Sequence, residues 1–312
     1  MHSRAGLLRK TVLVASGLTV IPLIVGWLVA RFVLYPKPKV EDHTLADFDL
    51  PVEPVSFVSR DGTRLAGWFI PPAGLAPAPA VVLSHGWGRS RAELLPHASF
   101  LHHAGYAVLA FDYRYRGESE GEHVTMGLHE QDDLLAAIDV LAARPEVDPA
   151  RLGVFGMSLG GAIAVLATAR EPRVRALAVE APYATHRAIM TRGIRHYLHL
   201  PTFPFADIAK VFIERRLGVP VAQLEPMGVV HLISPRPLFV IADELDTVVG
   251  CDESEMVFNA AGEPKRFWLV PGAAHARAWQ VARDEYERRL LDFFDEMLAQ
   301  QHAPAAARRA AS

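Results

Sequence analysis

The chain has 312 residues, of which 51% are hydrophobic, and a formal net charge of −3. This length can bury a substantial core in one large domain or two small ones. The absence of a basic stripe argues against nucleic-acid binding, and the single cysteine, Cys251, excludes an internal disulfide.

Residues 1–34 predict an N-terminal membrane anchor. Residues 11–30 contain no charged side chain, and a helix of this length spans about 30 Å, the thickness of a bilayer core. The alternative is a cleaved signal peptide whose charged region is Arg4, Arg9 and Lys10. The apolar run is long for that role, and the candidate cleavage site at residues 28–30 lacks a small first residue. We therefore expect an uncleaved single-pass helix that binds the lipid bilayer.

The orientation of this anchor depends on its flanking charges. Three basic residues precede the apolar run, and three follow it closely, so the positive-inside count is close to a tie. We expect the N-terminus in the cytoplasm and the rest of the chain outside it.

Residues 35–53 are polar and contain prolines, which predicts a linker. From residue 54 to residue 300, short apolar runs alternate with helix-like segments, and this alternation predicts a mostly parallel sheet with helices on both faces. The expected strands are residues 55–58, 65–70, 80–84, 107–111, 151–155, 176–179, 238–241 and 267–270, and the expected helices are residues 92–103, 130–144, 161–167 and 284–300. Residues 301–312 predict a disordered tail.

Residues 182–231 break the alternation. The segment is longer than an ordinary connection and contains helix-like pieces at residues 188–199 and 206–217. We expect a cap insertion over a pocket. The alternative is a helix pair that packs on the edge of the sheet.

Residues 156–160 read Gly-Met-Ser-Leu-Gly and fit the pattern G-x-S-x-G. A predicted strand precedes them and a predicted helix follows. This context favours a strained turn that lifts the hydroxyl of Ser158 above the sheet. Glycines are needed on both sides because side chains there would collide with the neighbouring strand and helix. The pattern predicts Ser158 as a nucleophile.

A serine nucleophile needs a base and a residue that orients the base. His275 follows the last predicted strand in a loop of small residues, at the sheet edge that also carries Ser158. Asp246 follows the strand at residues 238–241 and is our choice for the acid, because a carboxylate there can reach back under the histidine. Asp243 and Glu180 remain alternatives.

Two backbone N–H groups are expected to stabilise the oxyanion. One belongs to Leu159, the residue after the nucleophile, and the other to Trp87 in the sequence His85-Gly86-Trp87-Gly88. His85 is interpreted as a structural residue of that turn. This chemistry requires no metal and no organic cofactor.

The order of these motifs resembles the α/β-hydrolase superfamily over residues 54–299. Residues 111–119 are similar to the D-x-R-G-x-G-x-S stretch of that family, although Tyr115 stands where glycine is usual. Within the superfamily, the chain looks like membrane-anchored serine hydrolases with prolyl-oligopeptidase-like or dienelactone-hydrolase-like catalytic domains. Dienelactone hydrolases have a cysteine where this chain has Ser158, so lactone opening is not implied.

The expected function is hydrolysis of carboxylic esters or thioesters of small acyl substrates, through an acyl-enzyme formed on Ser158. A peptidase or an acyltransferase would use the same residues. A membrane-tethered scaffold without activity belongs to another class, and its usual sign is loss of a triad residue.

Overall fold

The computed structural model describes residues 20–299. Residues 1–19, which include the first part of the predicted anchor, and the predicted tail at residues 301–312 lie outside the described part of the chain.

The centre of the molecule is an eight-stranded sheet with the order β1-β2-β4-β3-β5-β6-β7-β8. The pairs β1–β2 and β2–β4 are antiparallel, and every other pair is parallel, which confirms the predicted mostly parallel sheet. The strands are β1 (Glu53–Val58), β2 (Arg64–Ile70), β3 (Ala78–Ser84), β4 (Ala107–Phe111), β5 (Val147–Met157), β6 (Val174–Glu180), β7 (Leu238–Asp243) and β8 (Lys265–Val270).

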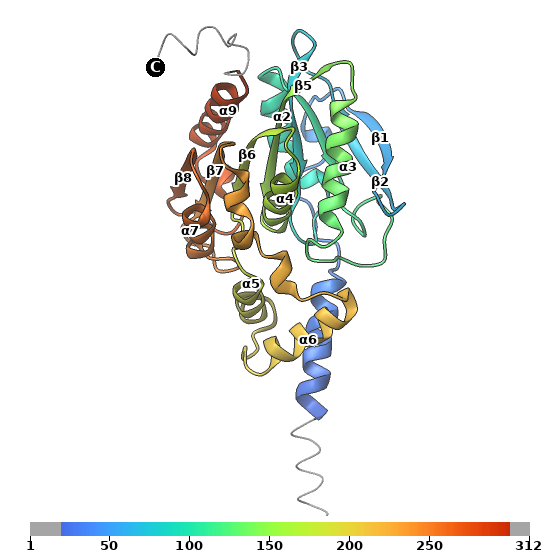
Figure 1. The fold of residues 1–312 in the computed structure, drawn as a ribbon, viewed down its shortest axis with the longest axis vertical. Coiled ribbons are helices and arrows are strands. Elements are labelled where there is room, and N and C mark those ends of the chain that lie inside the picture. Colours follow the sequence, from blue (N-terminus) through green and yellow to red (C-terminus); the bar gives the residue numbers. More distant parts are fainter. Residues whose placement is uncertain (1–19, 300–312) are drawn as a thin grey trace, which may run out of the picture.

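Helices cover both faces of the sheet because its central strands are apolar on both sides. On β3, Val82 packs into one hydrophobic cluster and Val81 into the other. The first cluster includes α3 (Glu130–Ala142), α4 (Leu159–Arg170) and α7 (Cys251–Ala260), and the second includes α2 (Leu95–His103) and α9 (Arg283–Ala299). These layers are visible in Figure 1.

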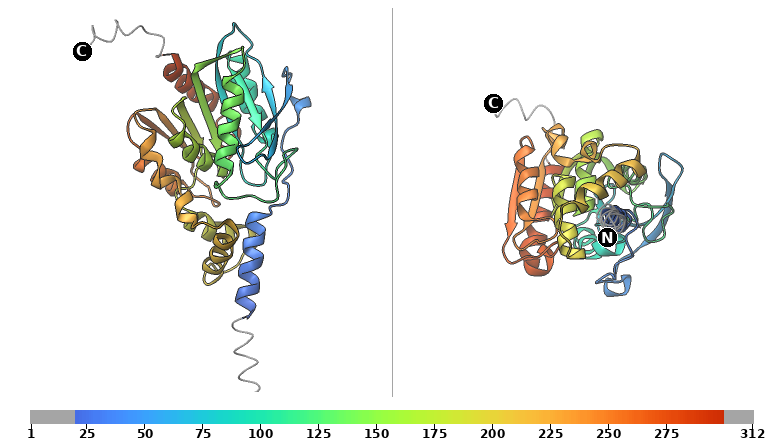
Figure 2. Two further views of the ribbon diagram at one scale, coloured as in Figure 1. Left: turned by 45° about the vertical axis from the view of Figure 1, so that its right-hand side comes forward. Right: turned by 90° about the horizontal axis from the view of Figure 1, so that it is seen from below.

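The predicted cap segment forms α5 (His186–Gly193), a π-helical turn η3 (Ile194–Leu198), α6 (Phe205–Leu217) and short 3-10 turns up to Ile233. Figures 1 and 2 show α5 and α6 together at one end of the domain, beside the helix formed by residues 20–34. This helix lies so close to α6 that a Cβ on Gly26 would sit 2.3 Å from the Cγ2 atom of Ile208.

The predicted membrane span has no counterpart among the helices of residues 20–299, none of which is long and apolar enough to cross a bilayer. The described part of the predicted anchor instead has two different sides. Val29, Ala30 and Leu34 are buried in the core, whereas Trp27 and Leu28 are exposed.

Candidate active site

Ser158 occupies the sharp turn between β5 and α4. Its backbone has φ 55° and ψ −121°, a conformation that non-glycine residues rarely adopt, and its N–H donates to the carbonyl of Glu180 at 2.8 Å. A Cβ on Gly156 would lie 2.6 Å from the carbonyl oxygen of Gly160, and one on Gly160 would lie 2.2 Å from the carbonyl oxygen of Ser84. The turn therefore requires both glycines, as the sequence pattern predicts.

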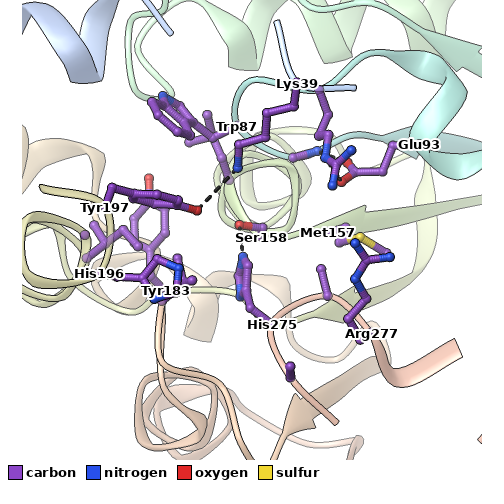
Figure 3. Close-up of a pocket in the computed structure, with 18 of the residues that line it drawn as sticks. Lys39, Trp87, Glu93, Met157, Ser158, Tyr183, His196, Tyr197, His275 and Arg277 are labelled. Carbon is purple, nitrogen blue, oxygen red and sulfur yellow. Dashed lines mark hydrogen bonds and ion pairs between the residues drawn. The ribbon is translucent and has the colours of Figure 1, made fainter. Parts of the chain in front are cut away.

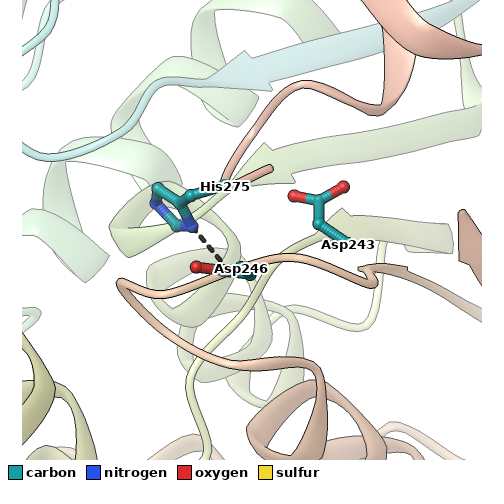
Figure 4. A group of neighbouring side chains, drawn as sticks. All are labelled: Asp243, Asp246 and His275. Atoms are coloured by element: carbon teal, nitrogen blue, oxygen red, sulfur yellow. Dashed lines mark hydrogen bonds and ion pairs between the residues drawn. The ribbon is translucent and has the colours of Figure 1, made fainter. Parts of the chain in front are cut away.

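Ser158, His275 and Asp246 form a hydrogen-bonded row. The Ser158 hydroxyl oxygen lies 2.9 Å from His275 Nε2, and His275 Nδ1 lies 2.7 Å from Asp246 Oδ2 (Figures 3 and 4). A neutral imidazole with its hydrogen on Nδ1 can donate to Asp246 and accept from Ser158. The structure thus brings together three residues that are 117 and 29 positions apart along the chain.

Backbone groups hold the Asp246 carboxylate in this position. Its Oδ1 atom accepts hydrogen bonds from the N–H groups of Val248 at 2.7 Å and Val249 at 2.9 Å. Burial alone would raise the pKa of Asp246, but the hydrogen bond from His275 and these two N–H groups bring its pKa below the ordinary value. Asp246 is therefore ionised at neutral pH.

The two alternative acids have other partners. Asp243 accepts a hydrogen bond from the N–H of Ala276 at 2.7 Å, and burial together with the charge of Glu180 raises the pKa of Asp243 to about 9. Glu180 accepts from the Tyr286 hydroxyl at 2.6 Å, and burial raises its pKa as well. In Figure 4 it is Asp246, not Asp243, that reaches the imidazole.

The three side chains Asp243, Asp246 and His275 have ligand atoms within 4.8 Å of one another, a spacing that a metal ion could use. The facing atoms of Asp246 and His275 are already hydrogen-bonded to each other. The raised pKa of Asp243 favours its protonated form, which is a poor metal ligand. The cluster fits the orientation of an imidazole better than it fits a metal centre.

Trp87 and Leu159, the expected oxyanion donors, line the same cavity as Ser158. The Trp87 indole N–H donates to the carbonyl of Val33 at 3.0 Å, so this loop is bound to the N-terminal helix. His85 accepts from the N–H of Tyr113 at 3.1 Å through Nε2, and burial lowers the pKa of His85 to about 4. A neutral, fully engaged His85 fits a structural role.

Glu93 is a cavity residue that the motifs did not indicate. Its carboxylate accepts the N–H of Gly86 at 2.7 Å and pairs with Arg89 at 3.2 Å. Burial raises the pKa of Glu93 to about 7. Glu93 therefore binds Gly86, the residue before Trp87. The charge of its carboxylate changes near neutral pH.

The cavity has a volume of about 350 Å³ and two chemically different sides. The apolar side is formed by helix 20–34 and the α5–η3 segment. The charged side is formed by residues 39–42, residues 86–93 and the loop after His275. The apolar lining includes Val29, Phe32, Val33, Ile189, Met190, Ile194 and Leu198, and the charged lining includes Lys39, Glu41, Asp42, Arg89, Glu93 and Arg277.

The expected linker is bound to this charged side. We call residues 37–43 the strap. Glu41 accepts hydrogen bonds from the N–H of Ser90 at 2.7 Å and from its hydroxyl at 2.8 Å. At its far end, Asp42 pairs with Arg277 at 2.6 Å, two residues after His275. The strap therefore contacts both the loop of the expected oxyanion donor and the loop of the histidine.

Comparisons with known proteins agree with this architecture. The family model of X-Pro dipeptidyl-peptidase (S15 family) matches residues 61–203. The solved esterase Pf2001 of Pyrococcus furiosus is 27% identical, with a TM-score of 0.71 over 85% of this chain and 98% of that one. The uncharacterized protein YfhR of Escherichia coli K12 is 29% identical over 88% of this chain and 94% of its own length.

The uncharacterized protein Rv2307c of Mycobacterium tuberculosis is 35% identical over 269 residues, which cover 84% of this chain and 85% of that protein. This similarity shows that the chain belongs to the same family as Rv2307c. Together with the S15 family model and the likeness to solved hydrolases, it identifies the chain as a hydrolase of the α/β-hydrolase fold.

Proposed function

We propose that the protein is a serine hydrolase that cleaves carboxylic esters or thioesters through an acyl-enzyme. The observation that carries this proposal is the row from the Ser158 hydroxyl to His275 at 2.9 Å and on to Asp246 at 2.7 Å. A base within hydrogen-bond reach of the nucleophile, itself oriented by a buried carboxylate, is the arrangement that activates a serine.

In this mechanism the Ser158 oxygen attacks the substrate carbonyl carbon while its proton passes to His275 Nε2. The N–H groups of Trp87 and Leu159 stabilise the oxyanion, each contributing about 3 kcal/mol. The intermediate collapses, the C–O or C–S bond to the leaving group breaks, and the leaving group takes the proton from His275. Water then attacks the acyl-enzyme by the same route and releases the acid.

Two observations support an esterase that accepts an apolar acyl group. The similar protein Pf2001 is an esterase, and one side of the cavity beside Ser158 is apolar, formed by helix 20–34 and α5. An apolar wall suits the hydrocarbon part of an acyl group.

A peptidase is the second candidate, because the S15 family model matches residues 61–203. The two candidates differ in the leaving group, which is an alcohol or thiol in one case and an amine in the other. Turnover of a p-nitrophenyl ester series, compared with Ala-Pro-p-nitroanilide, separates them. A preference for the anilide would replace the esterase proposal.

Labelling with a fluorophosphonate probe tests the nucleophile itself. We expect the native chain to be labelled and to hydrolyse short p-nitrophenyl esters, and Ser158→Ala to do neither. Ser119→Ala is a matched control, because the Ser119 hydroxyl lies away from the cavity and is bound to the carbonyl of Asp112. Hydrolysis that survives Ser158→Ala would refute the proposal.

We also propose that the N-terminal segment attaches the enzyme to a membrane, with the catalytic domain outside the cytoplasm. Apolar side chains on helix 20–34 that are 46–61% exposed support this proposal: Val20, Ile21, Leu23, Ile24, Trp27 and Leu28. They continue the uncharged run that begins at residue 11. Retention of the full-length chain in carbonate-washed membranes is the expected result, and release by carbonate alone would contradict it. Protease accessibility in sealed cells reports the orientation.

A further inference from the structure

Lys39 of the strap extends its side chain into the cavity that contains Ser158. In Figure 3 the ammonium group lies on the side of Ser158 opposite His275, between the rings of Trp87 and Tyr197. The two ring centroids are 5.0 and 5.1 Å from the Lys39 nitrogen, which also donates to the Tyr197 hydroxyl at 3.3 Å.

The backbone of Lys39 and of the two residues after it is held by the 88–90 loop. The Lys39 N–H donates to the carbonyl of Gly88 at 2.9 Å. The next two residues are tied to the same loop, since Arg89 donates to the carbonyl of Val40 and Ser90 to the carboxylate of Glu41. The fold thus places the start of the Lys39 side chain at the rim of the cavity, and the contacts with Trp87 and Tyr197 position its ammonium group.

Lys39 differs from the other cations of the cavity in its charge balance. Arg89 pairs with Glu93 at 3.2 Å, and Arg277 pairs with Asp42 at 2.6 Å. Within residues 20–299, no carboxylate comes within ion-pairing distance of the Lys39 ammonium. Burial, followed by the charge of Arg89, lowers the pKa of Lys39, and the charges of Glu93 and Glu41 offset only part of this effect. The ammonium is thus partly removed from water without a directly paired carboxylate.

A carboxylate on the substrate would supply that partner. A charge-assisted bond to a half-buried ammonium is stronger than a neutral one, and a lysine acts as a compact point charge that one carboxylate can satisfy. Glu41 and Glu93 lie on the same side of the cavity, and their charges repel a dianionic phosphate more strongly than a singly charged carboxylate. The arrangement therefore favours a monoanion.

We propose that Lys39 forms a substrate subsite for a carboxylate, so that the preferred substrates are esters that carry a carboxylate near the scissile bond. This inference rests on the proposed esterase function and adds a charge preference to it.

Two pairs of substrates test the subsite, one for each side of the scissile bond. The alcohol side is tested with 4-acetoxybenzoate and its neutral isostere 4-acetoxybenzamide. The acyl side is tested with the 4-nitrophenyl monoester of adipic acid and its methyl ester. The native enzyme should prefer the anionic member of at least one pair. In that pair, Lys39→Met should lower kcat/KM for the anion about tenfold to a hundredfold and leave the neutral member within about twofold.

Lys37→Met is the matched control, because it makes the same change on an exposed lysine of the strap outside the cavity, and it should leave both pairs unchanged. Equal losses on the charged and neutral members in Lys39→Met would indicate a packing role and overturn the proposal. So would the absence of any preference in the native enzyme.

Binding separates this proposal from the esterase proposal. In a Ser158→Ala background, the anionic member of at least one matched pair of amides should bind more tightly than the neutral member, and adding Lys39→Met should remove the difference. The pairs are 4-acetamidobenzoate with 4-acetamidobenzamide for the alcohol side, and the 4-nitroanilide of adipic acid with its methyl ester for the acyl side. This readout needs no catalysis, so it stands if ester hydrolysis fails. Equal binding within both pairs of ligands to Ser158→Ala, with Ser158-dependent ester hydrolysis intact in the native chain, would refute the subsite alone.

Discussion

The side chain of Asp246 is only 1% exposed, and its Oδ2 atom lies 2.7 Å from Nδ1 of the His275 imidazole. Replacing Asp246 by asparagine keeps the shape but can turn an N–H group toward the imidazole, which then loses the required tautomer. We expect Asp246→Asn to lower kcat about 10⁴-fold on a short p-nitrophenyl ester. Steady-state kinetics at neutral pH measure this loss.

Asp243→Asn is the comparison variant for the same acid position. Because the pKa of Asp243 is raised to about 9, the side chain is neutral at pH 7, and an amide oxygen can still accept the Ala276 N–H. The change in kcat should stay within about threefold. The reverse ranking of the two variants would show that the acid is misassigned.

Glu41→Gln tests the contribution of the strap to catalysis. It weakens the bonds to the Ser90 N–H and hydroxyl, and it removes the ion pair with Arg89. Charge-assisted bonds of this kind contribute about 1.5–3 kcal/mol, so a loosened loop should lower kcat about tenfold or more. Asp47→Asn is the control, since the Asp47 carboxylate binds Thr44 within the same connector, away from the cavity. Equal kcat values in the two variants would contradict a catalytic role for the strap.

Glu93→Gln should change the pH dependence of stability. Burial raises the pKa of Glu93 from 4.5 to about 7, so the folded protein holds a proton that the unfolded chain has lost. The corresponding stability is fully present below pH 4.5 and is lost as the pH rises through about 7, with a total of roughly 3 kcal/mol. Glutamine carries no charge at either pH, so the variant should lose less stability than the native chain between pH 5 and pH 8.

Urea unfolding at the two pH values measures this difference. Glu122→Gln, at a side chain that is 83% exposed, is the control and should follow the native chain. A Glu93→Gln curve parallel to the native one would show that Glu93 does not titrate in this range.

Gly160→Ala should destabilise the turn at Ser158. The added Cβ would lie 2.2 Å from the carbonyl oxygen of Ser84 and 2.4 Å from that of His85, and backbone atoms of a central strand cannot move aside easily. We expect a loss of about 1–3 kcal/mol in the free energy of unfolding. Gly228→Ala, where a Cβ would meet nothing within 4 Å, should change stability little. Thermal unfolding of both variants checks the contrast.

Much of this architecture could be predicted from local sequence. The buried strands are continuous apolar runs because both of their faces are covered, and the turn at Ser158 has a pattern imposed by steric limits on Gly156 and Gly160. The residues Asp246 and His275 follow neighbouring strands β7 and β8, so parallel strand ends bring them to one edge. Short sequence patterns were therefore sufficient to predict the strands, the turn at Ser158 and the sheet edge that carries Asp246 and His275.

The charged side of the cavity could not be predicted in this way. Polar residues among prolines are typical of a solvated linker, and nothing near Lys39 or Glu41 in the sequence identifies their partners. Ser90 lies 49 positions beyond Glu41, and Tyr197 lies 158 positions beyond Lys39. Glu93 has the same limitation, because its burial depends on the strap and the 86–90 loop meeting in space.

The indole of Trp87 is bound to the carbonyl of Val33, so an engineered chain that lacks the amino-terminal region would lose part of the pocket wall. Trimming the chain to residues 54–299, the usual way to obtain a hydrophobic-tailed enzyme in aqueous buffer, would keep all eight β-strands except the first residue of β1. It would also remove Val33, Lys39 and Glu41 from the pocket wall. It would remove the core residues Val29, Ala30 and Leu34 as well, so stability and specificity measured on the shortened chain would describe a different catalyst.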